Sequence, residues 1–427
     1  MNRSNDPYTV EKLDNGLTVV IERMPGVRSA AAGFFVRTGA RDEPPELAGV
    51  SHFLEHMMFK GTRRRTWQQI TIDFDRMGST YNAYTSEDRT VYYGWVRRED
   101  ILAQIELLAD MMRPALPPEE FDMEKNVVLE EIAMSKDNLD HLAFDFLQEK
   151  VFDGHPLAWP VLGYERTVRE MTRDQMQAYF EQRYIPGNMR LVVTGNVDPA
   201  EILDAARRYC GDWPKATPDD ARTPPTLRTG VDVLTVDRFH QQVVALTYPA
   251  VSAVDDRAET AGAAAAILGS ENSRFFWNIV QKGLAPRAGT YHLDYTDCGA
   301  MILFGVCDPD KADAVVGAMR EEACRICREP VKPEEVERVR NKRRTGLAVE
   351  SEVPYHRLVQ VMDDVEFRGA PRTIEQMLAD VEAVTVETIQ AYFDAFPIDG
   401  DGHLTSVGPR HWPASTSETT KPANDAT

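Results

Sequence analysis

The run PPELAGVSHFLEHMMFKGT, residues Pro44–Thr62, decides how the rest of the chain is interpreted. Its apolar residues recur with the period of a helix that packs one face on a core. Pro45 suits a first helical turn, where its missing N–H costs nothing, and Gly61 suits a helix end. Four residues fit this period and are expected to face the core: Leu47, Val50, Leu54 and Met57. The run therefore predicts one amphipathic helix.

Three polar residues gather on one face of this helix. At roughly 100° per residue, Glu55 and His56 lie about 60° and 40° to either side of His52. The pattern H-x-x-E-H reverses the usual order of the zinc peptidase motif, and both histidines can reach one metal ion. The alternative is a core histidine beside a surface one, but two imidazoles and a carboxylate on one arc favour the metal.

Two further runs support this interpretation. NAYTSEDRTVYY begins at Asn82, and EKNVVLEE begins at Glu124. Together with HFLEHMMFKGT they resemble the pitrilysin-type (M16) zinc metallopeptidases, in particular M16B-like members such as mitochondrial processing peptidase beta subunits and their bacterial relatives. The likeness is strong in the first half of the chain and weaker in the second. It implies a zinc-dependent endopeptidase that hydrolyses peptides or extended protein segments.

The resemblance also implies a ligand set for one zinc ion. His52 and His56 supply two ligands, and a catalytic zinc site needs about three protein ligands and a water. By register with the family, Glu131 is the third ligand. Glu124, two helical turns earlier on the same face, supports the ligands from outside. Glu130 is the rival for the third place, and an ordinary acidic helix without metal is the plainer alternative.

Glu55 is then free to act as the general base on the water that zinc activates, and to return the proton to the leaving amine. Asn82 and Ala83 match the family's edge strand, where a peptide substrate adds as an extra strand. An ordinary sheet strand is the alternative for that segment. A structural zinc usually takes four closed ligands that include cysteine, and no cysteine lies near either motif.

Composition narrows the function class. The chain has 427 residues, too many for one ordinary core, and a net charge of −20. That charge argues against a nucleic-acid partner, and it permits basic substrates or serves solubility alone. The five cysteines, an odd and sparse number, indicate a reducing compartment. No secretory signal and no apolar run of about 18 residues is present, so no membrane segment and a cytoplasmic location are expected.

Strands early and helices later predict α+β layers. The chain predicts strands over 8–12, 17–22, 30–38, 78–85, 90–96, 189–195 and 241–248, and helices over 66–77, 99–112, 117–152, 172–183, 199–210 and 258–268. The second half echoes the first: QAYFEQRYIPGNMRLVVTG and QAYFDAFPIDGDGHLTSVG end the two halves. We therefore expect two duplicated domains of LuxS/MPP-like fold, each an antiparallel or mixed sheet covered by helices.

The expected boundaries are a zinc-binding peptidase domain over 1–211, a linker over 212–230, a second domain over 231–412, and a disordered tail over 413–427. The second domain has Ala263 to Leu268 where the first has its metal ligands. Only the first domain is therefore expected to hold the metal.

The sequence departs from the family in the second half. Many single-chain relatives carry an Arg and a Tyr there that hold substrate, but this chain has Val280 and Pro286, with one residue missing between them. Arg287 and Tyr291 lie nearby at the wrong spacing. We therefore expect the catalytic subunit of a two-chain assembly, a dimer with a related subunit that supplies the missing pair. The alternatives are a non-catalytic scaffold subunit, although scaffold relatives usually lose H-x-x-E-H, and a zinc hydrolase of non-peptide substrates.

Overall fold

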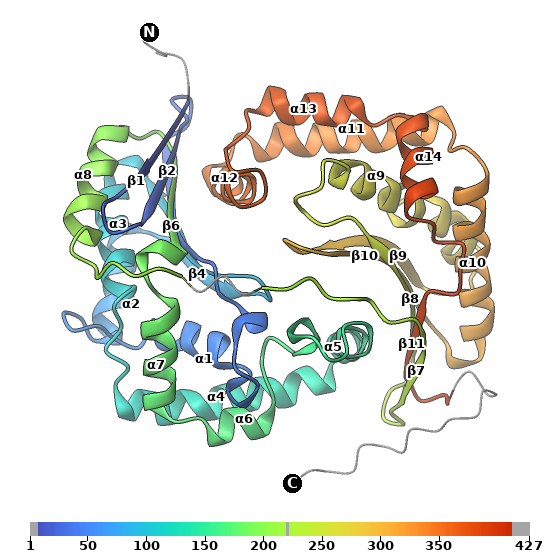
Figure 1. The fold of residues 1–427 in the computed structure, drawn as a ribbon, viewed down its shortest axis with the longest axis horizontal. Coiled ribbons are helices and arrows are strands. Elements are labelled where there is room, and N and C mark those ends of the chain that lie inside the picture. Colours follow the sequence, from blue (N-terminus) through green and yellow to red (C-terminus); the bar gives the residue numbers. More distant parts are fainter. Residues whose placement is uncertain (1–6, 219–221, 412–427) are drawn as a thin grey trace.

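Two β-sheets, each covered by helices, organise the chain (Figure 1). The computed structural model describes residues 7–218 and 222–411. The tail predicted over 413–427 lies outside the described residues. The α+β class and the two similar halves predicted from the sequence are confirmed by this architecture and by the fold comparisons reported below.

The first sheet has six strands in the order β1-β2-β6-β3-β5-β4. Only β2 and β6 run parallel; the other neighbours are antiparallel. Its strands are β1 (Tyr8–Lys12), β2 (Thr18–Arg23), β3 (Ser29–Val36), β4 (Thr80–Thr85), β5 (Thr90–Arg97) and β6 (Met189–Gly195). β3 is buried along nearly its whole length, which matches its run of apolar residues, whereas β4 is the edge strand.

The second sheet repeats this topology without a counterpart of β1. Its order is β7-β11-β8-β10-β9, with β7 and β11 parallel and the other neighbours antiparallel. The strands are β7 (Gly230–Thr235), β8 (Gln242–Ala250), β9 (Arg287–Asp294), β10 (Gly299–Cys307) and β11 (His403–Gly408). The last strand of each half inserts between two earlier ones, β6 between β2 and β3 and β11 between β7 and β8, and β4 and β9 occupy equivalent edges. An internal duplication accounts for this identity of order.

The helices follow the same repeat. In the first half they are α1 (Val50–Met57), α2 (Trp67–Met77), α3 (Ile101–Met111), α4 (Pro118–Asp137), α5 (Leu139–Val151), α6 (Glu165–Glu170), α7 (Arg173–Arg183) and α8 (Pro199–Cys210). In the second half they are α9 (Ala258–Gly269), α10 (Ala312–Arg328), α11 (Pro333–Glu350), α12 (Pro354–Arg368), α13 (Ile374–Ala383) and α14 (Val386–Ala395). The helical stretch predicted over 117–152, for which the sequence left a break open, is two helices, because Asn138 leaves the helical conformation and caps α5 with its side chain.

One helix from each half packs on the sheet of the other half. α12 packs on the first sheet, where Leu358, Val361 and Met362 join Val20 and Val192 in one apolar cluster. α5 packs on the second sheet in the same manner (Figure 1). This exchange fixes the two halves to one another.

A buried ion pair reinforces the α12 contact. Nε of Arg357 lies 2.9 Å from a carboxylate oxygen of Glu22 on β2, and both side chains are nearly inaccessible. The Tyr8 hydroxyl also contacts both groups. A charge at this depth is tolerable only when paired and hydrogen-bonded, and this pair joins the two halves.

Candidate metal centre

Helix α1 is shorter than the sequence predicted, since it begins at Val50 and not at Pro45. Pro45 starts only a 3-10 turn that ends at Leu47. Gly49 follows with a φ of 96°, and a Cβ there would lie 2.6 Å from the carbonyl oxygen of Leu162. Because Gly49 adopts this left-handed conformation, the 3-10 turn and α1 are separate elements. The helical period alone therefore placed the start of the helix too early.

A buried carboxylate replaces the missing helix cap. Glu43, 4% exposed, accepts the N–H of Gly49 at 2.6 Å and the N–H of Ser51 at 2.7 Å. Burial raises the pKa of Glu43 to about 8, and the two backbone donors oppose that shift. The donors belong to the first turn of α1, where orphan N–H groups attract negative charge. Glu43 therefore anchors the helix on which His52 and His56 lie.

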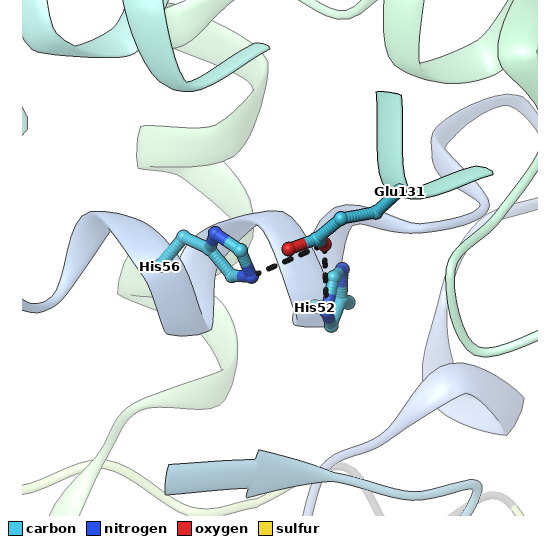
Figure 2. A group of neighbouring side chains, drawn as sticks. All are labelled: His52, His56 and Glu131. Atoms are coloured by element: carbon cyan, nitrogen blue, oxygen red, sulfur yellow. Dashed lines mark ion pairs between the residues drawn. The ribbon is translucent and has the colours of Figure 1, made fainter. Parts of the chain in front are cut away.

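Three side chains from two helices converge above α1 (Figure 2). Nε2 of His52 lies 3.7 Å from Oε2 of Glu131, and Nε2 of His56 lies 3.5 Å from the same oxygen. One ligand atom from each residue lies within 4.8 Å of the other two. Glu131 comes from α4, some 75 residues after the histidines, so the cluster exists only in the folded chain.

These positions fit a zinc ion. Two ligand atoms about 2.1 Å from a tetrahedral ion lie about 3.4 Å apart, close to the separations of Glu131 from both histidines. Two nitrogens and one oxygen also match the donor set of catalytic zinc sites. Among the residues that the structure describes, this is the one group of three or more His, Cys, Asp or Glu side chains close enough to share an ion.

Outer contacts fix the orientation of His56. Its Nδ1 lies 2.8 Å from Oε1 of Glu124, whose other oxygen lies 2.5 Å from Nζ of Lys60. Because a carboxylate only accepts, Nδ1 carries the proton, and Nε2 is left for a metal. Burial favours a neutral ring, but the hydrogen bond to Glu124 and the charges of Glu131 and Glu55 raise the pKa of His56 overall.

His52 is the more buried of the two histidines. Burial and the neighbouring His56 lower the pKa of His52 to about 3, so the ring is neutral at physiological pH. Its Nδ1 is buried and has no hydrogen-bond partner among the residues that the structure describes. A neutral imidazole is the form that binds metal ions.

Glu55 contacts neither histidine directly. Its Oε2 accepts a hydrogen bond of 2.6 Å from Oγ1 of Thr85, the last residue of β4. Burial raises the pKa of Glu55, and the hydroxyl of Thr85 and the charge of His56 oppose that rise. The charges of His56 and Glu131 therefore act on the Glu55 carboxylate, although it forms no hydrogen bond or ion pair with either residue.

The edge strand β4 runs beside α1. Asn82 is exposed on it and Ala83 is buried. The N–H of Ala83 donates to Oδ1 of the exposed Asn82 at 2.9 Å, which indicates that it points toward the free edge. An added peptide strand would find this donor at the edge.

The rival carboxylate lies elsewhere. Glu130 is exposed on α4, whereas Glu131 is partly buried beside the histidines. The segment with Val280 and Pro286 lies in the second half, where Ile279 is part of the core. No hydrogen bond or ion pair in the described part of the chain joins that segment to the metal cluster.

The second half has a cavity in place of a metal site. It measures about 810 Å³ and lies between α9, α11, α12 and the edge strand β9. Small residues of α9 and α11, among them Gly262, Ala263 and Gly346, line it together with charged residues such as Glu259 and Arg343. The duplicated halves therefore differ at their equivalent positions.

Comparison with known proteins gives the family. Residues 18–165 match the model for insulinase (peptidase family M16), and residues 170–343 match the model for the peptidase M16 inactive domain. The chain belongs to peptidase family M16. The M16 resemblance noted from the sequence is thereby confirmed.

Its M16 relatives span nearly the whole chain. A protein of Rickettsia bellii named as an uncharacterised zinc protease is 32% identical over 89% of this chain and 93% of its own length. A similarly named protein of Bacillus subtilis is 29% identical over 88% and 92%. The mitochondrial-processing peptidase subunit beta of Blastocladiella emersonii is 29% identical over 95% and 90%.

Solved structures support the fold. A protease from Helicobacter pylori superposes with a TM-score of 0.88 at 19% identity, covering 94% of this chain and 99% of that one. A peptidase M16 inactive domain from Pseudomonas fluorescens gives a TM-score of 0.86 at 16% identity, covering 95% and 98%. At this identity the likeness shows that the M16 fold is shared.

Sequence reasoning missed two residues that support the site: Thr85, which binds Glu55, and Glu43, which binds the start of α1. Thr85 follows Ala83 by two positions, so strand alternation puts both on the face toward α1. That signal was present in the sequence, but it became useful only once β4 was known to lie beside Glu55. Glu43 gave no such signal, because an acid before two prolines usually lies on the surface.

Proposed function

We propose that this M16 protein is a zinc metalloendopeptidase in which His52, His56 and Glu131 hold one zinc ion and Glu55 is the general base. The observation that carries the proposal is the approach of Glu131, from α4, to the Nε2 atoms of both histidines on α1. A fourth residue, Glu55, lies on the same helix without bonding to any of the three. The arrangement separates the ligands from the base.

A zinc ion held there would lower the pKa of a bound water toward neutrality and polarise the carbonyl of the scissile peptide. Glu55 removes the proton from the attacking water as the new C–O bond forms. The protonated carboxyl then donates that proton to the departing amide nitrogen as the C–N bond breaks. The hydrogen bond to Glu124 keeps the proton on Nδ1 of His56 throughout, so Nε2 of that ring remains available as a ligand.

The substrate is an extended peptide or an unfolded protein segment. It adds to the free edge of β4 beside Asn82 and Ala83, where main-chain hydrogen bonds supply affinity without demanding a particular sequence. Asn82 satisfies the N–H of Ala83 in the free protein and must release it when the peptide binds. A globular protein offers no free strand of this kind, so folded proteins are poor substrates.

The active form is a two-chain assembly. Val280 and Pro286 provide no side-chain donor for a reacting carbonyl. A related subunit that supplies an Arg and a Tyr would complete the site. The name of the Blastocladiella relative, a beta subunit, is consistent with such an assembly. A scaffold role is less well supported, because the complete ligand set is kept.

The structure has no helix, within its described residues, that is long and apolar enough to span a membrane. All five cysteines are free thiols. Because a reducing compartment keeps thiols unpaired, we assign the protein to the cytoplasm.

Glu55→Gln tests the proposal, because the amide cannot accept a proton but removes no ligand. The variant should retain about one zinc per chain and lose cleavage of an unstructured peptide, measured by mass spectrometry of the products. His52→Ala should lose the zinc. A Glu55→Gln protein that cleaves at the wild-type rate would show that the base is misassigned, and a wild-type protein with zinc and partner that cleaves no peptide would reject the peptidase function.

A further inference from the structure

The carboxylate of Glu55 has a single side-chain hydrogen bond within the described residues. Oγ1 of Thr85 donates to its Oε2 at 2.6 Å. The short distance is typical of a hydroxyl bonded to a charged acceptor. Among the described residues no donor binds the other oxygen, Oε1. One oxygen is therefore held while the other remains available to a water.

A glutamate needs such a contact to act from a fixed position. Its side chain has three rotatable bonds, and an unheld carboxylate would sample several rotamers. The proton transfer requires the base within hydrogen-bond reach of the water. Since the ligands are fixed by α1 and α4, the remaining freedom is that of the Glu55 side chain. The hydrogen bond from Thr85 removes much of this rotational freedom.

Thr85 is itself held firmly. It is the last residue of β4 and pairs with Thr90 on β5. The turn that follows is bound from the first half, because the N–H of Ala40 donates to the carbonyl of Ser86 at 3.1 Å. Its backbone can therefore move little relative to α1.

The same turn is also bound from the second half. Oγ1 of Thr296 donates to Asp88 at 2.9 Å, and Nη1 of Arg89 donates to Asp363 on α12 at 2.5 Å. Asp88 in addition accepts from Arg41 at 2.9 Å. The half without metal ligands thus reaches the end of the hairpin that carries Thr85.

We propose that Thr85 is a positioning residue for the general base, and that the second half contributes to catalysis by anchoring the hairpin end on which Thr85 lies. The inference rests on the proposed peptidase function. It gives the metal-free half a physical role: through Thr296 and Asp363 it fixes the turn, the turn fixes Thr85, and Thr85 orients Glu55. Thr85 touches neither substrate nor metal in this account.

Two substitutions test it in the zinc-loaded protein assembled with its partner. Thr85→Val keeps the shape and the strand preference but removes the donor; Thr85→Ser keeps the donor. In Thr85→Val, kcat should fall by about 10- to 100-fold, the usual loss when a supporting hydrogen bond to a functional side chain is removed. KM and zinc content should stay unchanged. Thr85→Ser should restore most of the rate.

Thr290→Val is the matched control. Thr290 lies on β9, the equivalent edge strand of the other half, and its buried hydroxyl has no hydrogen-bond partner. The same substitution there should leave kcat unchanged. A second readout does not depend on turnover: crystal structures of wild type and Thr85→Val should show the Glu55 carboxylate ordered in the first and rotated or disordered in the second.

Equal kcat values for wild type and Thr85→Val, or an unmoved Glu55 in the variant crystal, would overturn the inference while leaving the peptidase function intact. Absence of cleavage by the wild type would instead reject the function, and the crystal comparison would still decide the role of Thr85. Should Thr85→Val fold poorly, the comparison of Thr85→Ser with Thr85→Ala replaces it. Equal rates in that pair would likewise contradict the proposal.

Discussion

Glu124 accepts the Nδ1 proton of His56 across 2.8 Å, and this contact determines which nitrogen of the ring can face a metal. Lys60 binds the other oxygen of Glu124, so the carboxylate is held from both sides. Burial opposes ionisation, but His56 and Lys60 together lower the pKa of Glu124. The carboxylate therefore stays charged, and Nε2 of His56 points toward Glu131.

Glu124→Ala should weaken zinc binding by about 10- to 100-fold, because the ring loses the group that fixes its tautomer and orientation. Competition with a chromophoric chelator at neutral pH measures the change. Glu119→Ala is the control, since Glu119 lies exposed on the same helix. Unchanged zinc affinity in Glu124→Ala would show that His56 is oriented without it.

Glu131→Gln should lose tightly bound zinc, whereas Glu130→Gln should retain about one ion per chain. The two residues are neighbours on α4, but only Glu131 lies beside both histidines, and a neutral amide oxygen is a weaker ligand than a carboxylate. Elemental analysis after dialysis distinguishes them. The reverse result would assign the third ligand to Glu130.

Ala83→Pro should lower kcat/KM for an unstructured peptide by about tenfold, which corresponds to about 1.4 kcal/mol and to one lost hydrogen bond. Proline removes an N–H that faces the free edge, and edge strands tolerate proline there. Ala83→Ser, which keeps the N–H, is the control. Both variants should bind zinc like the wild type. Undiminished cleavage by Ala83→Pro would argue against strand addition at β4.

The sequence predicted the parts of the site that depend on local spacing. His52, Glu55 and His56 share a helix face because of the helical period, and the pattern required no tertiary information. The start of α1 could not be predicted in this way. It depends on the close approach of Gly49 to Leu162 and on a cap from Glu43, neither of which the helical period encodes.

Long-range placement was also beyond the sequence. The sequence predicted helix over the residues of α5, within 117–152, but it did not indicate which sheet that helix covers, and it gave no prediction for the residues of α12. That α5 and α12 cross to the opposite half follows from packing and from pairs such as Arg357 with Glu22. Glu131 was assigned by family register, and its role as a ligand remains a prediction.

Asp88→Asn should destabilise the protein by about 3 kcal/mol at neutral pH, the lower end for a buried ion pair that loses one partner. Burial opposes the charge of Asp88, but Arg222 and Arg41 lower its pKa below the ordinary value. Its stabilisation is therefore present above the unfolded pKa of about 3.9 and is lost as the pH falls through the lower folded pKa. Urea unfolding at neutral pH and at acid pH measures the free energy of unfolding of both proteins. The difference between wild type and variant should become smaller on acidification. A constant gap would mean that the charge of Asp88 contributes nothing.

The chain alone should cleave an unstructured peptide poorly, even when it holds a full complement of zinc, because Val280 and Pro286 supply no donor to the reacting carbonyl. Addition of a related subunit that carries the Arg and Tyr pair should raise kcat without changing zinc content. Replacement of that Arg and Tyr in the partner should abolish the gain, which separates a donated side chain from mere stabilisation. Native mass spectrometry reports the assembly under the assay conditions. Full activity of the isolated monomer would mean that residues of this chain complete the site, and the need for a partner would then be rejected.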